Sequence, residues 1–519
     1  MASLNPAALA TPSPTTKVQA QDASAEGRRA LRDSLIVTVG GQISRVVGTI
    51  TALAMKWGLD PASLGVYTGL RLFYDNTNRS SLGISVGAVQ EIPILRAAGR
   101  EADAQRVANV AFTTNTLTCL AYALGLVALA LWWAPLKAGD PLAAEWTWGL
   151  IAFAGLAIGK RYQDFLIAVH RAHQRFVLTT ELTILDSMVF ALLVIPGLWL
   201  AGFWGLLGAI AGLLAFNIVY LHARHPLRFQ WAWNRADFRR LFRVGLPILA
   251  NTAVFTAVLS LDRILILWLI PDGERSMGLY TIALMGTGWS LDLAGRIATV
   301  MYTYFQTTLG RTKNPVEVAR QAARVTEAQA PLLAAGSAVA YLVGPVFLGL
   351  LVPRYAEGLS ALRPLLPGML LLGLAWPARQ ALITVERPFR LATATLLGLA
   401  LTATAGAIGA DRAGIVGVAW GMSIGYASVY LLTATVAFSA ELGGRAWLIH
   451  QGRVFSTVAW YAAGAILAAH LPLPELSEWP TFAIRCSLLC AWGLPTLWLW
   501  GRRHGWGGIF ERRKRATRD

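Results

Sequence analysis

The chain alternates long apolar stretches with short polar gaps between residues 34 and 500. There are about fourteen such stretches, and most are long enough to cross the roughly 30 Å hydrocarbon core of a membrane as an α-helix. They are rich in Leu and Ala and lack the alternation of barrel strands, so helices are the structure that satisfies their backbone in lipid. The predicted membrane segments are residues 34–56, 64–89, 107–134, 146–169, 177–200, 203–221, 241–270, 276–309, 325–351, 362–384, 391–409, 413–440, 454–471 and 481–500.

The composition and the placement of charge agree with a membrane protein. Of 519 residues, 55% are hydrophobic and 14% are charged, and the formal net charge is +17. With the N-terminus placed in the cytoplasm, the inside gaps and termini hold about 32 Lys and Arg and the outside gaps about 6. Both termini are therefore predicted to be cytoplasmic. Loops that face anionic lipid explain the positive charge, so no nucleic-acid partner is expected.

The tails and the cysteines add little chemistry. Residues 1–33 are rich in Ala, Thr, Pro and Ser and lack the order of a secretory signal, so we expect a disordered cytoplasmic tail. Residues 501–519 are expected to form a basic cytoplasmic tail. The three cysteines, Cys119, Cys486 and Cys490, lie in apolar segments and indicate neither a disulfide framework nor a metal site.

The two halves of the chain contain a similar sequence motif. Segment two opens with Leu-Gly-Val-Tyr-Thr at residues 64–68, and segment eight opens with Met-Gly-Leu-Tyr-Thr at residues 277–281. Because each motif is in the second helix of its half, two parallel six-helix repeats are the natural inference. The predicted parts are an N-lobe at 34–222, a basic linker with an amphipathic helix at 223–240, a C-lobe at 241–440 and a C-terminal helix pair at 441–500.

Several motifs between residues 34 and 440 resemble those of the polysaccharide-transporter branch of the multidrug/oligosaccharidyl-lipid/polysaccharide exporter superfamily. The motifs are Leu-Gly-Val-Tyr at 64–67, Met-Gly-Leu-Tyr at 277–280, Ile92-Pro93 with the Arg-rich stretch at 96–106, Leu261-Asp262-Arg263, and Arg363-Pro364-Leu365-Leu366-Pro367-Gly368. The resemblance implies an all-α membrane fold of two six-helix lobes in a V, which open alternately to each side, plus a C-terminal helix pair.

The resemblance also implies a function. Such proteins are flippases of the bacterial inner membrane, and their typical cargo is a polyprenyl diphosphate that carries an oligosaccharide repeat unit for exopolysaccharide, capsule or O-antigen export. The implied partners are this lipid-linked oligosaccharide, membrane lipids, a polysaccharide polymerase and glycosyltransferases. No cofactor is expected beyond a coupling proton or Na⁺, and the protein is expected not to be an enzyme.

Arginines inside the segments are the candidate substrate residues. A charge near the bilayer centre costs at least about 2.5 kcal/mol, so such residues usually face a cavity or a partner. Guanidinium groups bind a diphosphate through paired hydrogen bonds, which favours an anionic cargo. The candidates are Arg45, Arg79 and Arg296 at mid-depth, and Arg71 and Arg263 nearer the outer ends. Arg71, Asp75 and Arg79 are spaced to share one stripe of segment two.

Acidic residues support a second, structural interpretation of these arginines. In it, Asp75 neutralises Arg71 or Arg79, Asp292 neutralises Arg296 in the same helix, and Asp262 lies beside Arg263. Glu181 and Asp186 in segment five are candidate coupling sites, or else local pairing partners near the inner interface. Two further arginines, Arg379 and Arg485, are close to segment ends and are expected to be interfacial anchors.

Three other classes of protein are weighed against the flippase. A multidrug or drug/ion antiporter shares the fold but favours acidic cavity residues, whereas these segments are basic. A flippase for a peptidoglycan precursor is a close relative that the sequence does not separate. A membrane glycosyltransferase or polymerase needs a set of acid/base or metal-binding carboxylates in an outside loop, and the outside loops hold only scattered acids.

Overall fold

A computed structural model describes residues 44–173, 175–472 and 478–503. The predicted tail at 1–33, the start of segment one at 34–43 and residues 504–519 of the predicted tail at 501–519 lie outside the described residues. Residues 501–503 end α14. The first half contains a helix over residues 44–58, α2 (Pro61–Asn76), η1 (Thr77–Ser81), α3 (Ile84–Ala97), α4 (Glu101–Trp133), α5 (Ala143–Ala172) and α6 (Phe176–Arg224). The second half contains α7 (Arg235–Leu269), α8 (Gly273–Thr312), α9 (Pro315–Leu351), η2 (Pro353–Ala361), α10 (Leu362–Leu374), α11 (Trp376–Thr384), α12 (Pro388–Leu442), α13 (Gly444–His470) and α14 (Glu478–Arg503).

The two longest helices each fold back on themselves. The backbone of α6 leaves helical geometry at Ala201 and Gly202, where the glycine has φ of 53°. The Asn217 side chain then reaches Asp186 at 2.6 Å, which places the two parts of α6 antiparallel. In α12 the same turn occurs at Ala413–Gly414. The first turn falls in the predicted gap at 201–202 and the second directly after the predicted gap at 410–412, so α6 and α12 each supply two predicted segments.

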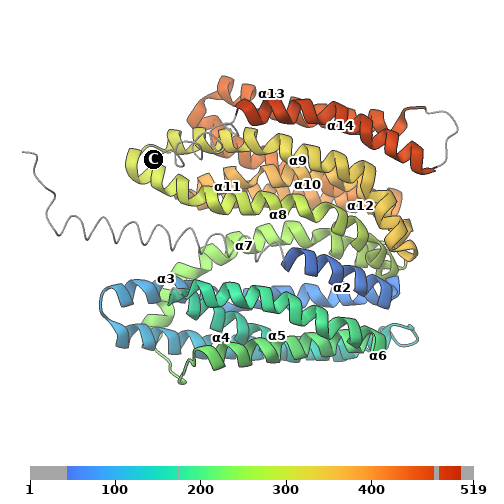
Figure 1. The fold of residues 1–519 in the computed structure, drawn as a ribbon. Helices are drawn as coiled ribbons and strands as arrows, with labels where there is room; N and C mark the ends of the chain where they lie inside the picture. The colour runs from blue at the N-terminus through green and yellow to red at the C-terminus, as the bar shows by residue number, and fades with distance from the viewer. Residues whose placement is uncertain (1–43, 174, 473–477, 504–519) are drawn as a thin grey trace, which may run out of the picture.

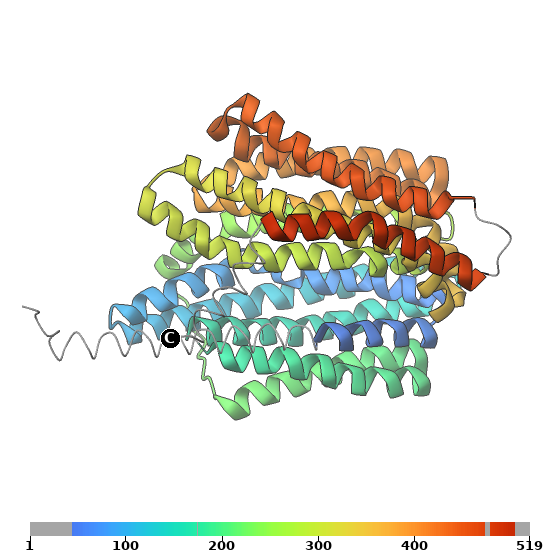
Figure 2. The ribbon, with the colours of Figure 1, turned by 45° about the horizontal axis from the view of Figure 1, so that its top comes forward.

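The helices form two groups that lie side by side. In Figure 1 the helices α2 to α6 lie in the lower group and α8 to α12 in the upper group, with α13 and α14 along its far edge. In Figure 2 the C-terminal helix pair has come forward and lies in front of the upper group, and α13 packs along α9. The all-α architecture is therefore confirmed, and the described ranges contain no strand. The two groups correspond to the predicted N-lobe and C-lobe.

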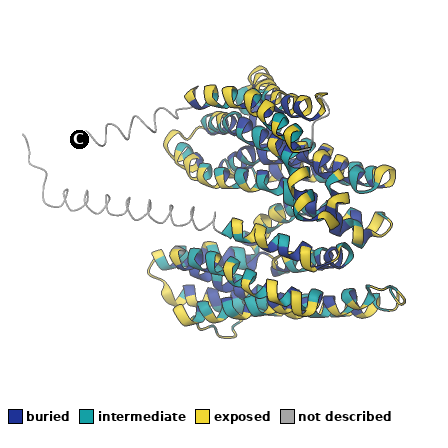
Figure 3. Cartoon of the chain, turned by 45° about the vertical axis from the view of Figure 1, so that its right-hand side comes forward, coloured by how far each residue is buried: buried dark blue, intermediate teal, exposed yellow. Residues whose placement is uncertain are grey.

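The surface of the helices has the character expected in lipid. Large apolar side chains are exposed along the helices, including Leu192 at 72% and Trp199 and Leu200 at 86%. Figure 3 shows exposed positions covering the outward faces while buried positions lie between helices. Seven described helices are long and apolar enough to cross a membrane: Glu101–Trp133, Val177–Arg224, Arg235–Leu269, Pro315–Leu351, Pro353–Thr384, Pro388–Ser439 and Trp479–Arg502.

Helix α7 connects the lobes and belongs partly to each. Its first turns pack on α3 of the N-lobe, where Arg240 pairs with Glu91 at 2.5 Å and Asp237 pairs with Arg106 at 2.9 Å. Its later turns pack on α12 in the C-lobe. The predicted amphipathic helix at 223–240 is not a separate element, because residues 226–234 are irregular and Arg235 begins α7 itself.

Predicted segment two is not one continuous helix. Helix α2 ends at Asn76, and Thr77–Ser81 form a 3-10 turn before α3 begins. Leu82 and Gly83 then adopt left-handed backbone geometry, with φ of 54° and 80°. The prediction that Arg71, Asp75 and Arg79 share one helical stripe is therefore wrong, because the helix that would align Arg79 has ended.

The contact between α3 and α7 generates a first prediction. A Cβ built on Gly245 would overlap the backbone of Gly83, so Gly245→Val forces the two helices apart. We expect the variant to lose about 1–3 kcal/mol of stability, as over-packed contacts do. The measurement is the thermal unfolding midpoint of detergent-purified protein. Gly125→Val in α4, where a Cβ meets open space, is the control, and equal midpoints for the two variants would contradict the prediction.

Candidate functional site

Two of the predicted site residues meet at the boundary between the lobes. Arg45, in the helix over residues 44–58, places Nη2 3.3 Å from a carboxylate oxygen of Asp292 on α8. The same nitrogen donates to the backbone oxygen of Trp289 at 3.3 Å. Asp292 therefore pairs across the lobes, and the expected pairing of Asp292 with Arg296 within one helix is wrong. The side chains of Arg45 and Asp292 remain 30% and 56% exposed.

Arg296 lies on the same face of α8 as Asp292. The two residues are one turn apart, so the face that meets the N-lobe also carries the Arg296 guanidinium. Arg296 is exposed and forms no ion pair with any described residue. In the N-lobe, Arg79 on η1 is half-buried and likewise has no ion pair within the described ranges. These two guanidinium groups are not neutralised by direct contact.

Arg71 on α2 is partly neutralised by its own helix. Its Nε is 3.4 Å from a carboxylate oxygen of Asp75, and its Nη1 donates to the Tyr67 hydroxyl at 3.0 Å. Both charged side chains are close to half exposed. The charges on Arg71 and Asp75 therefore cancel, as the structural interpretation of the sequence expects for this pair.

Asp262 and Arg263 are in the C-lobe, close to its core. Asp262 is fully buried, and one of its carboxylate oxygens accepts the backbone N–H of Arg263 at 2.8 Å. The other oxygen has no hydrogen bond to a described residue. Two buried tyrosines, Tyr280 on α8 and Tyr426 on α12, lie close to this carboxylate. The result is a desolvated carboxylate surrounded by phenol groups.

The two carboxylates of segment five have local partners. Glu181 accepts a hydrogen bond from Tyr220 at 3.0 Å and pairs with Arg224 at 3.2 Å, which is near the inner end of α6. Asp186 accepts from the Asn217 amide at 2.6 Å. These contacts agree with the interpretation of Glu181 and Asp186 as local pairing partners.

A second polar cluster lies inside the N-lobe and is absent from the sequence-based candidates. Arg161 on α5 is only 2% exposed, donates to Ser80 at 2.6 Å, and leaves Nε and Nη1 without hydrogen bonds to described residues. One turn away on the same helix, Asp164 accepts from Lys160 and from Asn78, each at 2.5 Å. These charged residues fall inside predicted segment four, so the sequence alone could have identified them as candidates. They are close to the basic inner gap, and for that reason they are grouped with its loop residues.

The sequence predicts that Arg379 is an interfacial anchor, and this prediction is wrong. It is 5% exposed on α11, and its guanidinium carbon lies 3.7 Å from the ring centre of Phe255 on α7. Nη1 also reaches the Thr395 hydroxyl at 3.4 Å. The break between α10 and α11 turns this side chain inward, which helix periodicity alone does not predict. Arg485 on α14 is half-buried.

The lobes are closed against each other at the end where α2 and α8 begin. The charge distribution predicts this end to face outward, so we call it the outer end. A Cβ on Gly65 would overlap the backbone of Glu274, and one on Gly278 would overlap that of Pro61. Tyr355 on η2 also donates its hydroxyl to the backbone oxygen of Leu59 at 2.9 Å. The repeated glycines of the sequence motifs are thus the points of closest contact between the lobes.

Ion pairs reinforce this outer closure. Lys137, in the turn before α5, contacts Glu274 at 2.9 Å and Asp140 at 2.8 Å. Trp146 donates its indole N–H to the same Glu274 carboxylate at 3.1 Å. The hydrogen bond from Lys137 holds the pKa of Asp140 below its ordinary value. Lys137 and Trp146 are on the N-lobe and Glu274 is on the C-lobe, so these contacts tie the lobes together.

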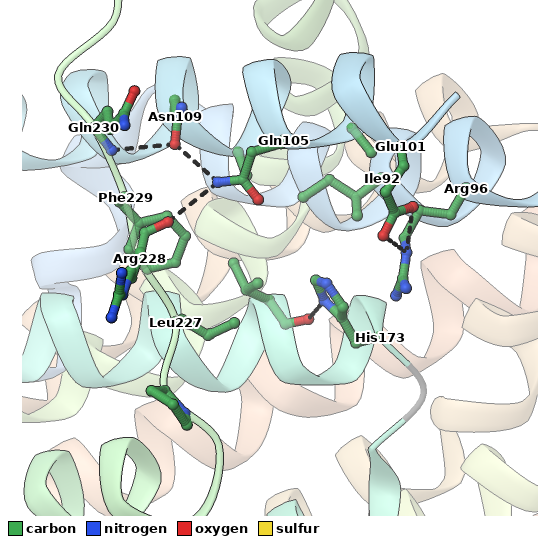
Figure 4. A pocket seen from close by; sticks show the side chains of 14 residues that line it. Ile92, Arg96, Glu101, Gln105, Asn109, His173, Leu227, Arg228, Phe229 and Gln230 are labelled. Carbon is green, nitrogen blue, oxygen red and sulfur yellow. Dashed lines mark hydrogen bonds and ion pairs between the residues drawn. The ribbon is translucent and has the colours of Figure 1, made fainter. Parts of the chain in front are cut away.

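The opposite end carries a polar pocket of about 420 Å³ beneath the connection between the lobes. Figure 4 shows Asn109 between Gln230 and Gln105, accepting from the Gln230 backbone at 3.2 Å and from the Gln105 amide at 3.1 Å. Gln105 also donates to the Arg228 carbonyl at 3.2 Å, and Phe229 stacks on the N-lobe. The polar groups at this position fasten the connecting segment to the N-lobe.

Comparisons with known proteins agree with this architecture. Residues 94–351 match the family described as polysaccharide biosynthesis protein. The lipid II flippase MurJ, in an inward closed conformation, aligns over 90% of this chain and 99% of its own, with a TM-score of 0.68 and 10% identity. An inward-facing multidrug resistance MATE family transporter of the MOP superfamily aligns over 80% and 95%, with a TM-score of 0.58 and 14% identity.

A further solved structure, an outward-facing multidrug resistance MATE transporter of the same superfamily, aligns over 82% of this chain and 96% of its own, with a TM-score of 0.53 and 16% identity. No curated protein matches the chain in sequence. The chain is thus a multi-pass membrane protein whose structural neighbours are transporters and flippases rather than enzymes. The family match over residues 94–351 and the shared fold agree with the polysaccharide-transporter resemblance that the motifs predict.

The outer closure generates a second prediction. Gly278→Val should separate α8 from α2 and open the outer end, because its side chain overlaps backbone that has no room to move. A cysteine placed at Leu59, which is 3% exposed, should then react several-fold faster with a membrane-impermeant thiol reagent. All labelling variants also carry Cys486→Ser and Cys490→Ser, so that these two native cysteines do not react with the reagent.

Gly288→Val on the same helix is the matched control, since a Cβ there meets nothing within 4 Å. Its labelling rate should equal that of the unsubstituted background. An unchanged rate for Gly278→Val, with folding verified by size-exclusion chromatography, would show that the glycine contact does not hold the outer end shut.

Proposed function

We propose that this protein is a flippase that moves a polyprenyl-diphosphate-linked oligosaccharide repeat unit from the cytoplasmic to the outer face of the bacterial inner membrane. The product serves export of an exopolysaccharide, capsule or O-antigen. One observation carries the proposal: Arg45 pairs with Asp292 across the lobes, whereas Arg296, one turn along α8, and Arg79 in the N-lobe have no ion pair among the described residues. A boundary with uncompensated guanidinium groups favours an anionic cargo.

The ion pair between Arg45 and Asp292 suggests how the cargo enters. Both side chains are partly exposed, so their pairing contributes little net stability. A diphosphate offers more oxygen acceptors than Asp292 and can displace its carboxylate from Arg45. Arg296, one turn along α8, is then positioned to bind the same anion. In this scheme Arg71 and Arg263 act later in the transit, nearer the outer end.

Transport follows from rocking of the lobes. The outer end is closed by the Gly65 and Gly278 contacts, which must separate for the cargo to leave. The first turns of α7 are tied to the N-lobe while its later turns belong to the C-lobe, and Pro247 lies between these two parts. Bending at Pro247 lets the lobes rotate without breaking the connection. The polyprenyl tail stays in lipid and passes between the helix over residues 44–58 and α8.

The proposed topology places both termini in the cytoplasm, following the bias of basic residues. Partners in the same pathway are the glycosyltransferases that build the repeat unit and the polymerase that consumes it. Two alternatives share the fold. A multidrug/ion antiporter would bind cations, which the arginine excess disfavours. A peptidoglycan-precursor flippase uses the same diphosphate chemistry, so cargo assays with defined glycans distinguish it.

A third prediction tests the cationic boundary. The triple variant Arg45→Ala, Arg79→Ala and Arg296→Ala should lose at least about tenfold in flipping rate, since each lost charge-assisted hydrogen bond is worth about 1.5–3 kcal/mol. The measurement is transbilayer movement of a fluorescent polyprenyl-diphosphate-linked oligosaccharide in proteoliposomes.

The control variant is Arg412→Ala, which removes an exposed arginine from the outer turn of α12. It should transport at the rate of the wild type. Asp292→Asn separates loss of the ion pair from loss of the anion-binding charge, and it should retain transport. Wild-type flipping by the triple variant would reject the cationic mechanism, and drug efflux without lipid flipping would favour the antiporter.

A fourth prediction concerns coupling. We propose that Asp262 binds the driving proton or Na⁺, because it is a fully buried carboxylate with one oxygen that no described residue satisfies. Asp262→Asn should abolish stimulation of flipping by an imposed proton or Na⁺ gradient while leaving cargo binding intact. Asp186→Asn and Glu181→Gln are comparison variants at carboxylates that already have partners. Gradient stimulation that survives in Asp262→Asn would refute this role.

A further inference from the structure

The outer closure encloses a lysine that is absent from the candidates described above. Lys56 lies in the last turn of the helix over residues 44–58 and is 6% exposed. Its Nζ is 5.9 Å from the ring centre of Tyr355 on η2, which belongs to the C-lobe. The ammonium group forms no ion pair or hydrogen bond with a described residue. A cation of the N-lobe is therefore buried at the contact between the lobes without a carboxylate partner.

The carboxylates of the outer closure already have other partners. Asp60, which follows Lys56 closely in the chain, accepts two backbone N–H groups in the first turn of α2 and so caps that helix. Glu145 accepts a serine hydroxyl at 2.8 Å, and Glu274 pairs with Lys137 at 2.9 Å. Burial of a charge without such a partner costs free energy. The closed form thus lacks the group that would compensate Lys56.

Lys56 and Arg45 lie on the same face of their helix. Lys56 comes eleven residues after Arg45, which is about three turns of an α-helix, so the two side chains point in nearly the same direction. Both contact the C-lobe, Arg45 through Asp292 on α8 and Lys56 through η2. At about 1.5 Å per residue, the two positions are roughly 16 Å apart along the helix axis. This face therefore carries one cation at the contact with α8 and a second at the outer closure.

Small side chains occupy this face between the two cations. Thr49 is exposed and Ala52 is half-buried. A Cβ built on the neighbouring Gly48 meets nothing within 4 Å. The helix thus leaves space beside it for a group that moves outward from Arg45 to Lys56.

The contacts that cover Lys56 are contacts that must separate when the outer end opens. Tyr355 donates its hydroxyl to the backbone oxygen of Leu59 at 2.9 Å. Trp57 donates its indole N–H to the backbone oxygen of Leu351, at the end of α9, at 2.7 Å. Both hydrogen bonds join the end of the first helix to the C-lobe. Their loss uncovers the ammonium group at the stage when the cargo leaves.

We propose, on the basis of the proposed function, that Lys56 is the exit-side anion site of the transport path and binds the diphosphate of the cargo when the lobes separate. A lysine ammonium is a compact charge with three donors and binds phosphate oxygens well. Arg45 binds the diphosphate first, and Lys56 receives it nearer the outer face. A cation or an uncharged glycan would leave the uncovered ammonium uncompensated.

The first test compares transport of the fluorescent polyprenyl-diphosphate-linked oligosaccharide in proteoliposomes. Lys56→Met, which keeps the length of the side chain and removes its charge, should transport at least about tenfold more slowly, as the loss of one charge-assisted hydrogen bond predicts. Lys56→Arg should transport close to the wild-type rate. Lys313→Met is the matched control at an exposed lysine in the turn after α8, and it should behave as the wild type. Wild-type transport by Lys56→Met would overturn the proposal.

Unfolding midpoints separate a binding role from a structural one. The cargo-free Lys56→Met protein should unfold at the wild-type temperature or above it, because an apolar side chain replaces an unpaired buried charge. A lower midpoint together with slow transport in both Lys56→Met and Lys56→Arg would show that Lys56 is a structural residue and would overturn the proposal.

A chemical protection experiment tests the anion site without the lipid. The outer end is opened with Gly278→Val, and acetylation of Lys56 in the detergent-purified protein is followed by peptide mass spectrometry. Inorganic pyrophosphate should slow this reaction several-fold, whereas chloride at the same ionic strength should not. Lys313 in the same protein is the internal reference, and its rate should not change. Absence of reaction at Lys56, or a rate that pyrophosphate leaves unchanged, would refute the site.

The two experiments distinguish failure of this site from failure of the proposed function. A wild type that moves none of the lipid-linked oligosaccharide contradicts the proposed function, and the protection experiment then decides whether Lys56 binds a diphosphate. A wild type that moves the lipid as well as Lys56→Met does contradicts only the role of Lys56.

Discussion

The low dielectric of the membrane interior constrains the charged groups that the structure describes within the membrane-spanning helices. An isolated charge is costly there, so each one must find a carboxylate, an aromatic face, a hydroxyl or water. Arg45 pairs with Asp292, Arg379 lies over Phe255, and Arg161 bonds to Ser80. Arg79 and Arg296 differ from these residues, because neither has an ion pair within the described part of the chain. The guanidinium groups without a carboxylate partner are the basis of the proposed anion-binding surface.

The internal sequence repeat corresponds to equivalent helix contacts and turns in the two halves of the structure. Each half has its closest contact to the other at a glycine of the shared motif, Gly65 in one and Gly278 in the other. Each half also contains one hairpin-like turn at an Ala-Gly pair, in α6 and in α12. Small residues at these points let backbones approach closely, as in other membrane helix contacts. Two similar rigid bodies joined at one end are suited to rocking.

The connections between the bodies are unequal in strength. Helix α7 is anchored to the N-lobe by two ion pairs and continues into the C-lobe core. The segment before it is fastened to α4 through Asn109 and Gln105. By contrast, α13 packs along α9 and leaves a cavity against α10 and α12.

The sequence by itself determined the all-α membrane architecture and the two-lobe repeat, because hydropathy, basic-residue bias and repeated motifs act over short distances along the chain. It also identified Arg45, Arg79 and Asp292 as candidates. Only the tertiary structure decided which charges meet. Asp292 pairs with Arg45 across the lobes rather than with Arg296, and the break after α2 removes Arg79 from the stripe of Arg71. Periodicity assumes continuous helices and same-helix neighbours, whereas partner choice depends on packing between distant segments and on where helices break.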